Sequence, residues 1–302
     1  MIFEGKSNLN YLLHGLFETY LNAVPDVKKT SSILIENSVI QSQSEIVNDH
    51  IAFRTLGLPN LGIHSLEQIF LHFGYTKRDF YHFEEKKLDA YWYAPPNEEF
   101  PRIFISELKV DQLSKTSQAI IEEYTKSISS DPVYNIDLDN PEDVLHFFNH
   151  PLWGLPTLED YEFLSKESEY AAWVIYNRYY LNHYTISVHE LNEPYNQLEN
   201  FNYLLKKNGI VFNNAGGEIK TSGDGLLKQS STVAQTINAL FSCGKTHPIS
   251  GSYVEFAERL PLPEFSSKTN QKLNRDQRRE GFETSNADKI FESTFICQTK
   301  RK

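Results

Sequence analysis

Two histidines and one glutamate have the residue types and the strand contexts of a divalent metal site. His50 lies in the sequence DHIAFR, His183 in NHYTIS and Glu255 in YVEFAER, and each sequence reads as a short β-strand. Two imidazoles and one carboxylate are a common ligand set for a divalent metal that keeps coordination positions open for other ligands. These three residues indicate a metalloenzyme.

A histidine in a strand is more often a core or edge residue than a ligand, and we expect this of most of the ten histidines. His50 and His183 differ because each begins a strand in an equivalent context. Glu255 differs because it lies in an apolar strand, where an unpaired buried carboxylate would be costly. His189 stays open as an alternative to His183, because a strand over 183–189 would place both residues on one face.

Arg54 and Glu107 are the charged residues expected beside these ligands. Side-chain alternation places Arg54 on the same strand face as His50. Its guanidinium could hold an anion beside the metal through a bidentate contact, or it could form a salt bridge with Glu107. Glu107 is therefore either a further ligand or a structural partner. On the last strand, the same alternation gives one face to Tyr253, Glu255, Ala257 and Arg259.

A pattern of one strand, one helix and three strands occurs twice and would position these residues. The first copy has a strand at 49–56, a helix at 65–73 and strands at 75–83, 88–93 and 102–110. The second has a strand at 183–189, a helix at 195–207, short strands within 210–227 and a final strand at 252–260. Normal element and connection lengths accommodate both copies. We predict an α+β fold in which two strand–helix–three-strand modules form a curved mixed sheet around a metal cavity, with additional helices.

The length of 302 residues allows one large domain with a substantial core. We predict a single metalloenzyme domain over 1–302. Its expected parts are an N-terminal helical segment (1–45), a first module (46–110), a helical insertion (111–180), a second module (181–260) and a C-terminal segment that docks on the body (261–302).

The composition argues against several classes of partner. The chain has 29 Lys and Arg against 40 Asp and Glu, a net charge of −11, which argues against a nucleic acid. No apolar run approaches the roughly 20 residues needed to cross a bilayer, and no secretory signal is recognisable. Cys243 and Cys297 lack the spacing of a disulfide framework. We expect a cytoplasmic protein that acts on a small molecule, and the sequence leaves its oligomeric state open.

Four segments resemble one enzyme family. VNDHIAFR, NHYT, YVEFAER and GFETSNAD resemble the 2-oxoadipate dioxygenase/decarboxylase family, also called hydroxyglutarate synthase, and the similarity extends from about residue 45 to 295. That family is related to the vicinal oxygen chelate superfamily of glyoxalases and extradiol dioxygenases, so the two modules are expected to be of this type. The D-H-x-x-x-R and Y-V-E-F motifs are specific in combination and weak singly. Well-known members are longer, which affects the expected substrate more than the metal site.

The resemblance implies a reaction and a role for each site residue. His50, His183 and Glu255 would bind Fe(II), and Arg54 would be the catalytic residue that binds a substrate carboxylate. Family members convert 2-oxoadipate and O₂ to 2-hydroxyglutarate and CO₂ without a separate 2-oxoglutarate. Another divalent metal such as Zn, Ni or Mn remains an alternative to iron.

Two other functions are compatible with the same residues. A glyoxalase-like lyase or isomerase would use the metal as a Lewis acid, with Glu107 as its base. A non-catalytic protein would bind a small ligand in the same cavity. Activity without O₂ would favour the first alternative, and ligand binding without metal would favour the second.

Overall fold

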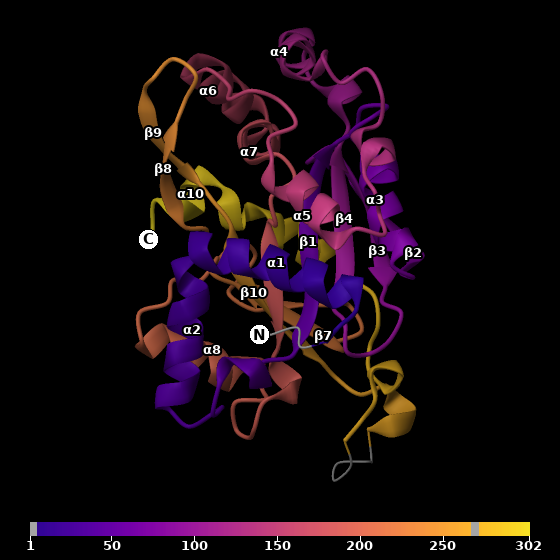
Figure 1. The fold of residues 1–302 in the computed structure, drawn as a ribbon. Helices are drawn as coiled ribbons and strands as arrows, with labels where there is room; N and C mark the ends of the chain where they lie inside the picture. The colour runs from indigo at the N-terminus through magenta and orange to yellow at the C-terminus, as the bar shows by residue number, and fades with distance from the viewer. Residues whose placement is uncertain (1–4, 267–271) are drawn as a thin grey trace.

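One curled, eight-stranded mixed sheet forms the centre of the protein (Figure 1). The computed structural model describes residues 5–266 and 272–302. The sheet has the strand order β2-β3-β4-β1-β5-β10-β7-β6, and β8 and β9 form a separate hairpin. The strands are β1 (Asn48–Leu56), β2 (Thr76–Phe83), β3 (Leu88–Ala94), β4 (Arg102–Leu108), β5 (His183–Ser187), β6 (Lys220–Thr221), β7 (Leu227–Ser231), β8 (Thr236–Leu240), β9 (Thr246–Ser250) and β10 (Tyr253–Arg259).

The helices surround this sheet. They are α1 (Asn8–Ala23), α2 (Pro25–Glu36), α3 (Ile63–His72), α4 (Lys115–Thr125), α5 (Pro141–Asn149), α6 (Leu158–Glu167), α7 (Glu169–Asn177), α8 (Leu198–Lys207), α9 (Thr284–Phe291) and α10 (Ile296–Thr299). Four of them, α4 to α7, lie in the sequence between β4 and β5. No helix in the described part of the chain combines the length and the apolar character needed to span a bilayer.

Both predicted modules are present. The first is β1-α3-β2-β3-β4, and the second is β5-α8-β6-β7-β10 with the β8-β9 hairpin inserted. In each module the first and last strands pair in parallel, β1 with β4 and β5 with β10. An antiparallel pairing of β1 with β5 joins the modules. The predicted α+β fold is confirmed, whereas the division of the chain into one domain with five segments stays a prediction.

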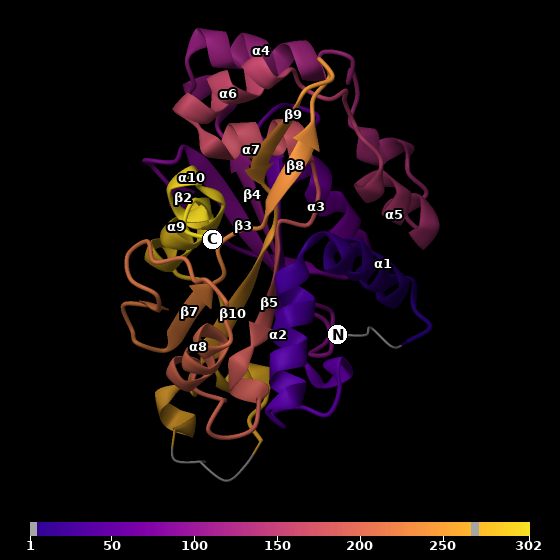
Figure 2. The same cartoon turned by 90° about the vertical axis from the view of Figure 1, so that its left-hand side faces the viewer.

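Helices cover both faces of the sheet (Figure 2). α1 and α2 lie on one side, and α9 lies on the other. There α9 contacts β2 near one edge of the sheet and β6 and β7 at the opposite edge. A flat sheet of this width could not bring both edges to one helix, so the curl of the sheet around α9 creates an enclosed interior.

Equivalent glycines end the helix of each module. Gly74 follows α3 with φ +85°, and Gly209 follows α8 with φ +78°. A residue in this left-handed region commonly terminates a helix, and glycine adopts it without a steric penalty. Each helix therefore stops where the chain must turn back toward the sheet.

α1 packs its apolar stripe behind the strands that join the modules. Its buried residues are Leu9, Leu12, Leu13, Leu16, Phe17 and Tyr20. The Phe17 ring meets the Tyr184 ring of β5 edge-on, with centroids 5.3 Å apart. The Tyr20 hydroxyl donates a hydrogen bond to the Tyr253 carbonyl oxygen of β10. α1 thus supports β5 and β10 from the face opposite the enclosed interior.

We expect Phe17→Ala to lower the free energy of unfolding by about 3–5 kcal/mol, because it removes a buried ring and leaves a cavity. Urea or thermal unfolding would measure this loss. Tyr11→Ala on the same helix is the matched control, since Tyr11 is 47% exposed, and its effect should stay within about 1 kcal/mol. Similar losses in the two variants would contradict this role of α1.

Candidate metal centre

Three neighbouring strands bring His50, His183 and Glu255 together. β1, β5 and β10 carry one residue each, and potential ligand atoms of the three side chains all lie within 4.8 Å of one another. His183 Nε2 is 3.3 Å from His50 Nε2 and 3.1 Å from Glu255 Oε2. All three side chains are buried. In the described part of the chain, this is the one cluster of three His, Cys, Asp or Glu residues close enough to share a metal ion.

Each histidine is oriented by the residue that precedes it. His50 Nδ1 lies 2.8 Å from Asp49 Oδ1, and His183 Nδ1 lies 3.0 Å from Asn182 Oδ1. These acceptors favour the proton on Nδ1 and leave the Nε2 lone pairs directed at each other and at Glu255. Ligand histidines in metal sites commonly make this second contact. The converging lone pairs and carboxylate therefore fit a divalent metal.

Glu255 is an ionised carboxylate in a buried place. Burial alone would raise its pKa, but the neighbouring His50 and His183 outweigh burial and hold the pKa well below its ordinary value. Its Oε1 accepts a hydrogen bond of 2.6 Å from Gln229 Nε2. Gln229 Oε1 in turn accepts one of 3.1 Å from Asn286 Nδ2. This chain of amides fixes Gln229 as a donor toward Glu255.

The two imidazoles differ in their affinity for a proton. For His50, burial opposes the cation, but Glu255 and Asp49 outweigh burial and raise the pKa. For His183, burial dominates and lowers the pKa. A metal and a proton therefore compete mainly at His50, since metal binding requires the neutral imidazole.

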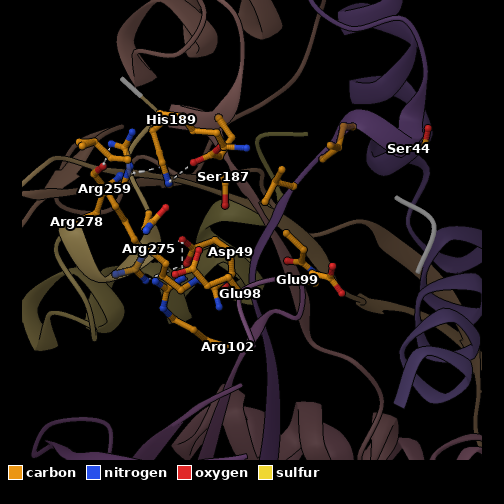
Figure 3. A pocket seen from close by; sticks show the side chains of 17 residues that line it. Ser44, Asp49, Glu98, Glu99, Arg102, Ser187, His189, Arg259, Arg275 and Arg278 are labelled. Atoms are coloured by element: carbon orange, nitrogen blue, oxygen red, sulfur yellow. Dashed lines mark hydrogen bonds and ion pairs between the residues drawn. The ribbon is translucent and has the colours of Figure 1, made fainter. Parts of the chain in front are cut away.

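Two buried arginines, Arg259 and Arg102, hold Asp49 in place beside His50, and Figure 3 shows both of them with Asp49. Arg259 grips the carboxylate with two bonds, Nε to Oδ2 at 2.7 Å and Nη2 to Oδ1 at 2.9 Å. Arg102 Nη1 adds a contact of 3.2 Å to Oδ2. Burial would raise the pKa of Asp49, but Arg259 and Arg102 outweigh it and hold the pKa well below the ordinary value. Arg259, predicted as a site residue, thus contacts the candidate ligand His50 only through Asp49.

A β-bulge explains how adjacent residues contribute to the same site. The pairing of β1 with β5 shifts register between Asn48 and Ile51, so β1 carries one extra residue there. Regular alternation would point Asp49 and His50 to opposite faces. Bulges are frequent next to active sites because they redirect a side chain. Here the bulge brings the Asp49 carboxylate to His50 Nδ1.

Arg54 is a buried cation without a carboxylate partner among the described residues. It is 1% exposed, and its hydrogen bonds go to Thr294 Oγ1 at 3.0 Å and to the Phe291 carbonyl oxygen at 3.1 Å. Its guanidinium lies over the rings of Tyr170 and Trp173, 5.0 and 5.1 Å from their centroids. Burial lowers the pKa of Arg54, as expected for a cation with little compensation.

Tyr253 lies beside both Arg54 and the ligand cluster. Its ring stacks on His183 with centroids 4.8 Å apart. The Tyr253 hydroxyl and Arg54 Nε are both buried without a hydrogen-bond partner. Burial raises the pKa of Tyr253 far above neutrality, so its hydroxyl keeps its proton. The charge of Glu169 offsets only part of the burial of Arg54. Two donors without a hydrogen bond and a partly compensated positive charge therefore lie beside the cluster, as expected of an anion site.

Two sequence candidates lie elsewhere. Glu107 Oε2 accepts a hydrogen bond of 2.7 Å from the Ile63 amide at the start of α3, so it is neither in the cluster nor paired with Arg54. The expected strand over 183–189 was too long, because β5 ends at Ser187 and a 3₁₀ turn follows. His189 therefore leaves the strand face, and its Nδ1 accepts a hydrogen bond of 3.2 Å from the Arg259 amide.

The cavity at the cluster is small, about 20 Å³. Such a volume holds one water-sized ligand. Its lining residues include the apolar side chains of Phe104, Phe282, Ile290 and Phe291. A substrate with several carbons would have to displace some of these side chains, and three of the four belong to the C-terminal segment around α9.

Sequence reasoning assigned no role to Asp49, Asn182 or Gln229. A signal for the first two was present, because a hydrogen-bond acceptor directly precedes each candidate histidine in DHIAFR and NHYTIS. Gln229 gave no signal, because its contact with Glu255 depends on the pairing of β7 with β10.

Known proteins share the sequence and the fold of this chain. The family model described as 2-oxoadipate dioxygenase/decarboxylase matches residues 12–269. A protein of Arabidopsis thaliana named 2-oxoadipate dioxygenase/decarboxylase is 43% identical over 300 residues, which cover 95% of this chain and 78% of the relative. A protein of Oryza sativa subsp. japonica with the same enzyme name is 41% identical over 302 residues, covering 96% and 80%.

Solved structures agree with this similarity. The hydroxyglutarate synthase of Oryza sativa, solved in complex with 2-oxoadipate, is 40% identical with a TM-score of 0.87, covering 96% of this chain and 93% of that one. A Ralstonia eutropha protein assigned to the glyoxalase superfamily is 21% identical with a TM-score of 0.70, covering 92% and 87%. The second structure shows a shared fold alone.

The names of the plant relatives correct one expectation. The Arabidopsis protein is named chloroplastic and the rice protein chloroplastic/amyloplastic. The expectation of a cytoplasmic location is therefore wrong.

The family match covers most of the chain, and both plant relatives exceed 40% identity over nearly all of it. The interior cluster and the unpaired arginine lie within the matched region. The chain belongs to the 2-oxoadipate dioxygenase/decarboxylase family.

Proposed function

We propose that this protein is an Fe(II)-dependent enzyme that converts 2-oxoadipate and O₂ to 2-hydroxyglutarate and CO₂. The observation that carries the proposal is the buried cluster of His50, His183 and Glu255 beside Arg54, a cation without a carboxylate partner in the described chain. The rice structure that contains 2-oxoadipate supports this substrate. A six-carbon dicarboxylate offers one end to a metal and the other to a guanidinium.

His50, His183 and Glu255 would hold the metal on one side and leave the other side to substrate and O₂. Bound Fe(II) would supply the redox chemistry that activates O₂, and it has open coordination positions for a 2-oxo acid when two histidines and one carboxylate bind it. Asp49 and Asn182 keep the protons of the two imidazoles on Nδ1. Gln229 holds Glu255 Oε1, which leaves Oε2 directed toward His183.

Arg54 would bind the distal carboxylate of the substrate. The guanidinium can form a planar, two-bond contact with a carboxylate, and its burial excludes competing water. The nearby Tyr253 hydroxyl would donate to a substrate oxygen, since it keeps its proton and lacks a partner. Together they would fix the carbon chain relative to the metal, and such positioning contributes several kcal/mol to catalysis.

The two alternative functions lose support. A lyase or isomerase was expected to use Glu107 as its base, and Glu107 instead holds the first turn of α3. A non-catalytic binding protein is disfavoured by membership of a family of enzymes. We infer iron rather than Zn, Ni or Mn from the redox reaction with O₂ that is named for the family.

We expect His50→Ala, His183→Ala and Glu255→Ala each to remove most of the bound metal, because each deletes one of three ligands. Metal analysis after anaerobic loading with Fe(II) would measure this. His189→Ala is the control and should retain the metal, since His189 lies outside the cluster. Metal retention in His183→Ala together with loss in His189→Ala would show that the second ligand is wrongly assigned.

We expect Arg54→Ala to keep its iron but to lower kcat/KM for 2-oxoadipate about 10- to 150-fold, the effect of losing a hydrogen bond to a charged group. Arg54→Lys should recover only part of the activity, because lysine lacks the planar fork. Steady-state kinetics would measure both, with circular dichroism as a check on folding. An unchanged kcat/KM in Arg54→Ala would assign Arg54 a structural role.

With Fe(II) and 2-oxoadipate, we expect O₂ consumption and CO₂ release in equal amounts, without added 2-oxoglutarate. Oxygen-18 from O₂ should appear in both the new carboxylate and the hydroxyl of the product, because one O₂ molecule supplies both atoms. An oxygen electrode and mass spectrometry would measure these quantities. Equal turnover under strict anaerobiosis would rule out the dioxygenase reaction and support a lyase or isomerase.

A further inference from the structure

A second and much larger cavity lies behind the metal centre. It has a volume of about 410 Å³ and includes Asp49, Arg102 and Arg259 in its wall. It shares no lining residue with the small cavity at His50, His183 and Glu255. Figure 3 shows Arg102, Arg259, Arg275 and Arg278 gathered near Asp49. The volume lies in the range of small-molecule sites.

The wall of this cavity includes Asn48, a buried polar side chain that forms no hydrogen bond. It is 7% exposed and lines the cavity. Neither its amide nitrogen nor its amide oxygen has a hydrogen-bond partner. A buried amide without partners is destabilising, so the unpaired amide of Asn48 indicates a group that gains its hydrogen bonds when the cavity is occupied.

Arg275 and Arg278 lack carboxylate partners within the described residues. Arg275 Nη1 donates to the Phe100 carbonyl oxygen at 2.9 Å, and Arg278 Nη1 donates to the Arg259 carbonyl oxygen at 2.8 Å. Arg278 Nε is buried without a partner. Burial and the nearby Arg102 lower the pKa of Arg275 to about 10, so it remains a cation at neutral pH.

The acidic residues around the cavity compensate these two arginines only in part. Asp49 is already held by Arg259 and Arg102. The charges of Asp49 and Glu280 act on Arg275, and those of Glu190 and Glu258 act on Arg278, but burial outweighs them and lowers the pKa of both arginines. The inner wall therefore carries positive charge that makes no direct carboxylate contact within the described residues.

We propose that this cavity binds a small organic anion through a carboxylate or phosphate group held by Arg275 and Arg278, with Asn48 contacting a polar group of the same molecule. Two guanidinium groups match the geometry of either oxyanion. An amide both donates and accepts, so it suits a hydroxyl or oxo group on the ligand. The site is separate from the proposed substrate site, because Arg54 does not line this cavity.

Calorimetric titration of the metal-loaded protein, kept anaerobic, would test the proposal. Inorganic phosphate and glutarate are the two probes, and they distinguish a phosphate ligand from a carboxylate ligand. We expect at least one to bind at millimolar concentration or below, and Arg275→Gln and Arg278→Gln each to weaken binding about 10-fold or more. Arg279→Gln is the matched control from the same segment, because Arg279 pairs with Asp224 outside the cavity and should leave binding unchanged.

Two further variants keep the test decisive. Asn48→Leu should weaken anion binding while leaving thermal stability without anion equal or higher, because it removes a buried unpaired amide. Arg54→Ala should leave the binding of inorganic phosphate unchanged, whereas glutarate can also occupy the proposed substrate site at Arg54. Three results would overturn the proposal: binding by neither probe, wild-type affinity in both Arg275→Gln and Arg278→Gln, or loss of phosphate binding in Arg54→Ala.

Discussion

The buried ion pair between Asp49 and Arg259 joins the two modules and sets the orientation of a candidate metal ligand. Asp49 lies at the bulge of β1, and Arg259 lies at the end of β10, the last strand of the second module. The carboxylate accepts from Arg259, Arg102 and His50 at once. Removing one partner of a buried pair typically costs about 3–5 kcal/mol, because a charge is left without compensation. The position of His50 is therefore coupled to the packing of both modules.

This ion pair also lies between two cavities of different character. On one side, a small dry cavity surrounds His50, His183 and Glu255. On the other, a cavity of about 410 Å³ includes arginines without carboxylate partners. The protein thus carries buried or half-buried cations that are only partly compensated at two places, Arg54 in one and Arg275 and Arg278 in the other. Such groups reduce stability unless an anion compensates them, and this is the physical reason to assign both places to ligands.

The C-terminal segment completes the interior that the sheet begins. α9 contacts both edges of the curled sheet, and the following residues supply Thr294 to Arg54. Phe282 meets the His50 ring edge-on at 4.8 Å. A sheet of two such modules without this segment would leave the cluster open to water. Dryness strengthens the electrostatic contacts of the site, and the segment provides it.

The amino-acid pattern alone predicted the two modules, the candidate ligands His50, His183 and Glu255, and an Arg54 that faces the same interior. These follow from local periodicity, since a strand exposes alternate residues on one face and a histidine at its start can be recognised. It did not separate His183 from His189, because the point at which β5 gives way to a 3₁₀ turn depends on pairing and packing. Three contacts became visible in the folded chain alone: Glu107 holds α3, Asp49 binds Arg259, and Gln229 contacts Glu255. Those contacts join residues far apart in the chain, and local patterns carry no information about which distant strands pair or in which register.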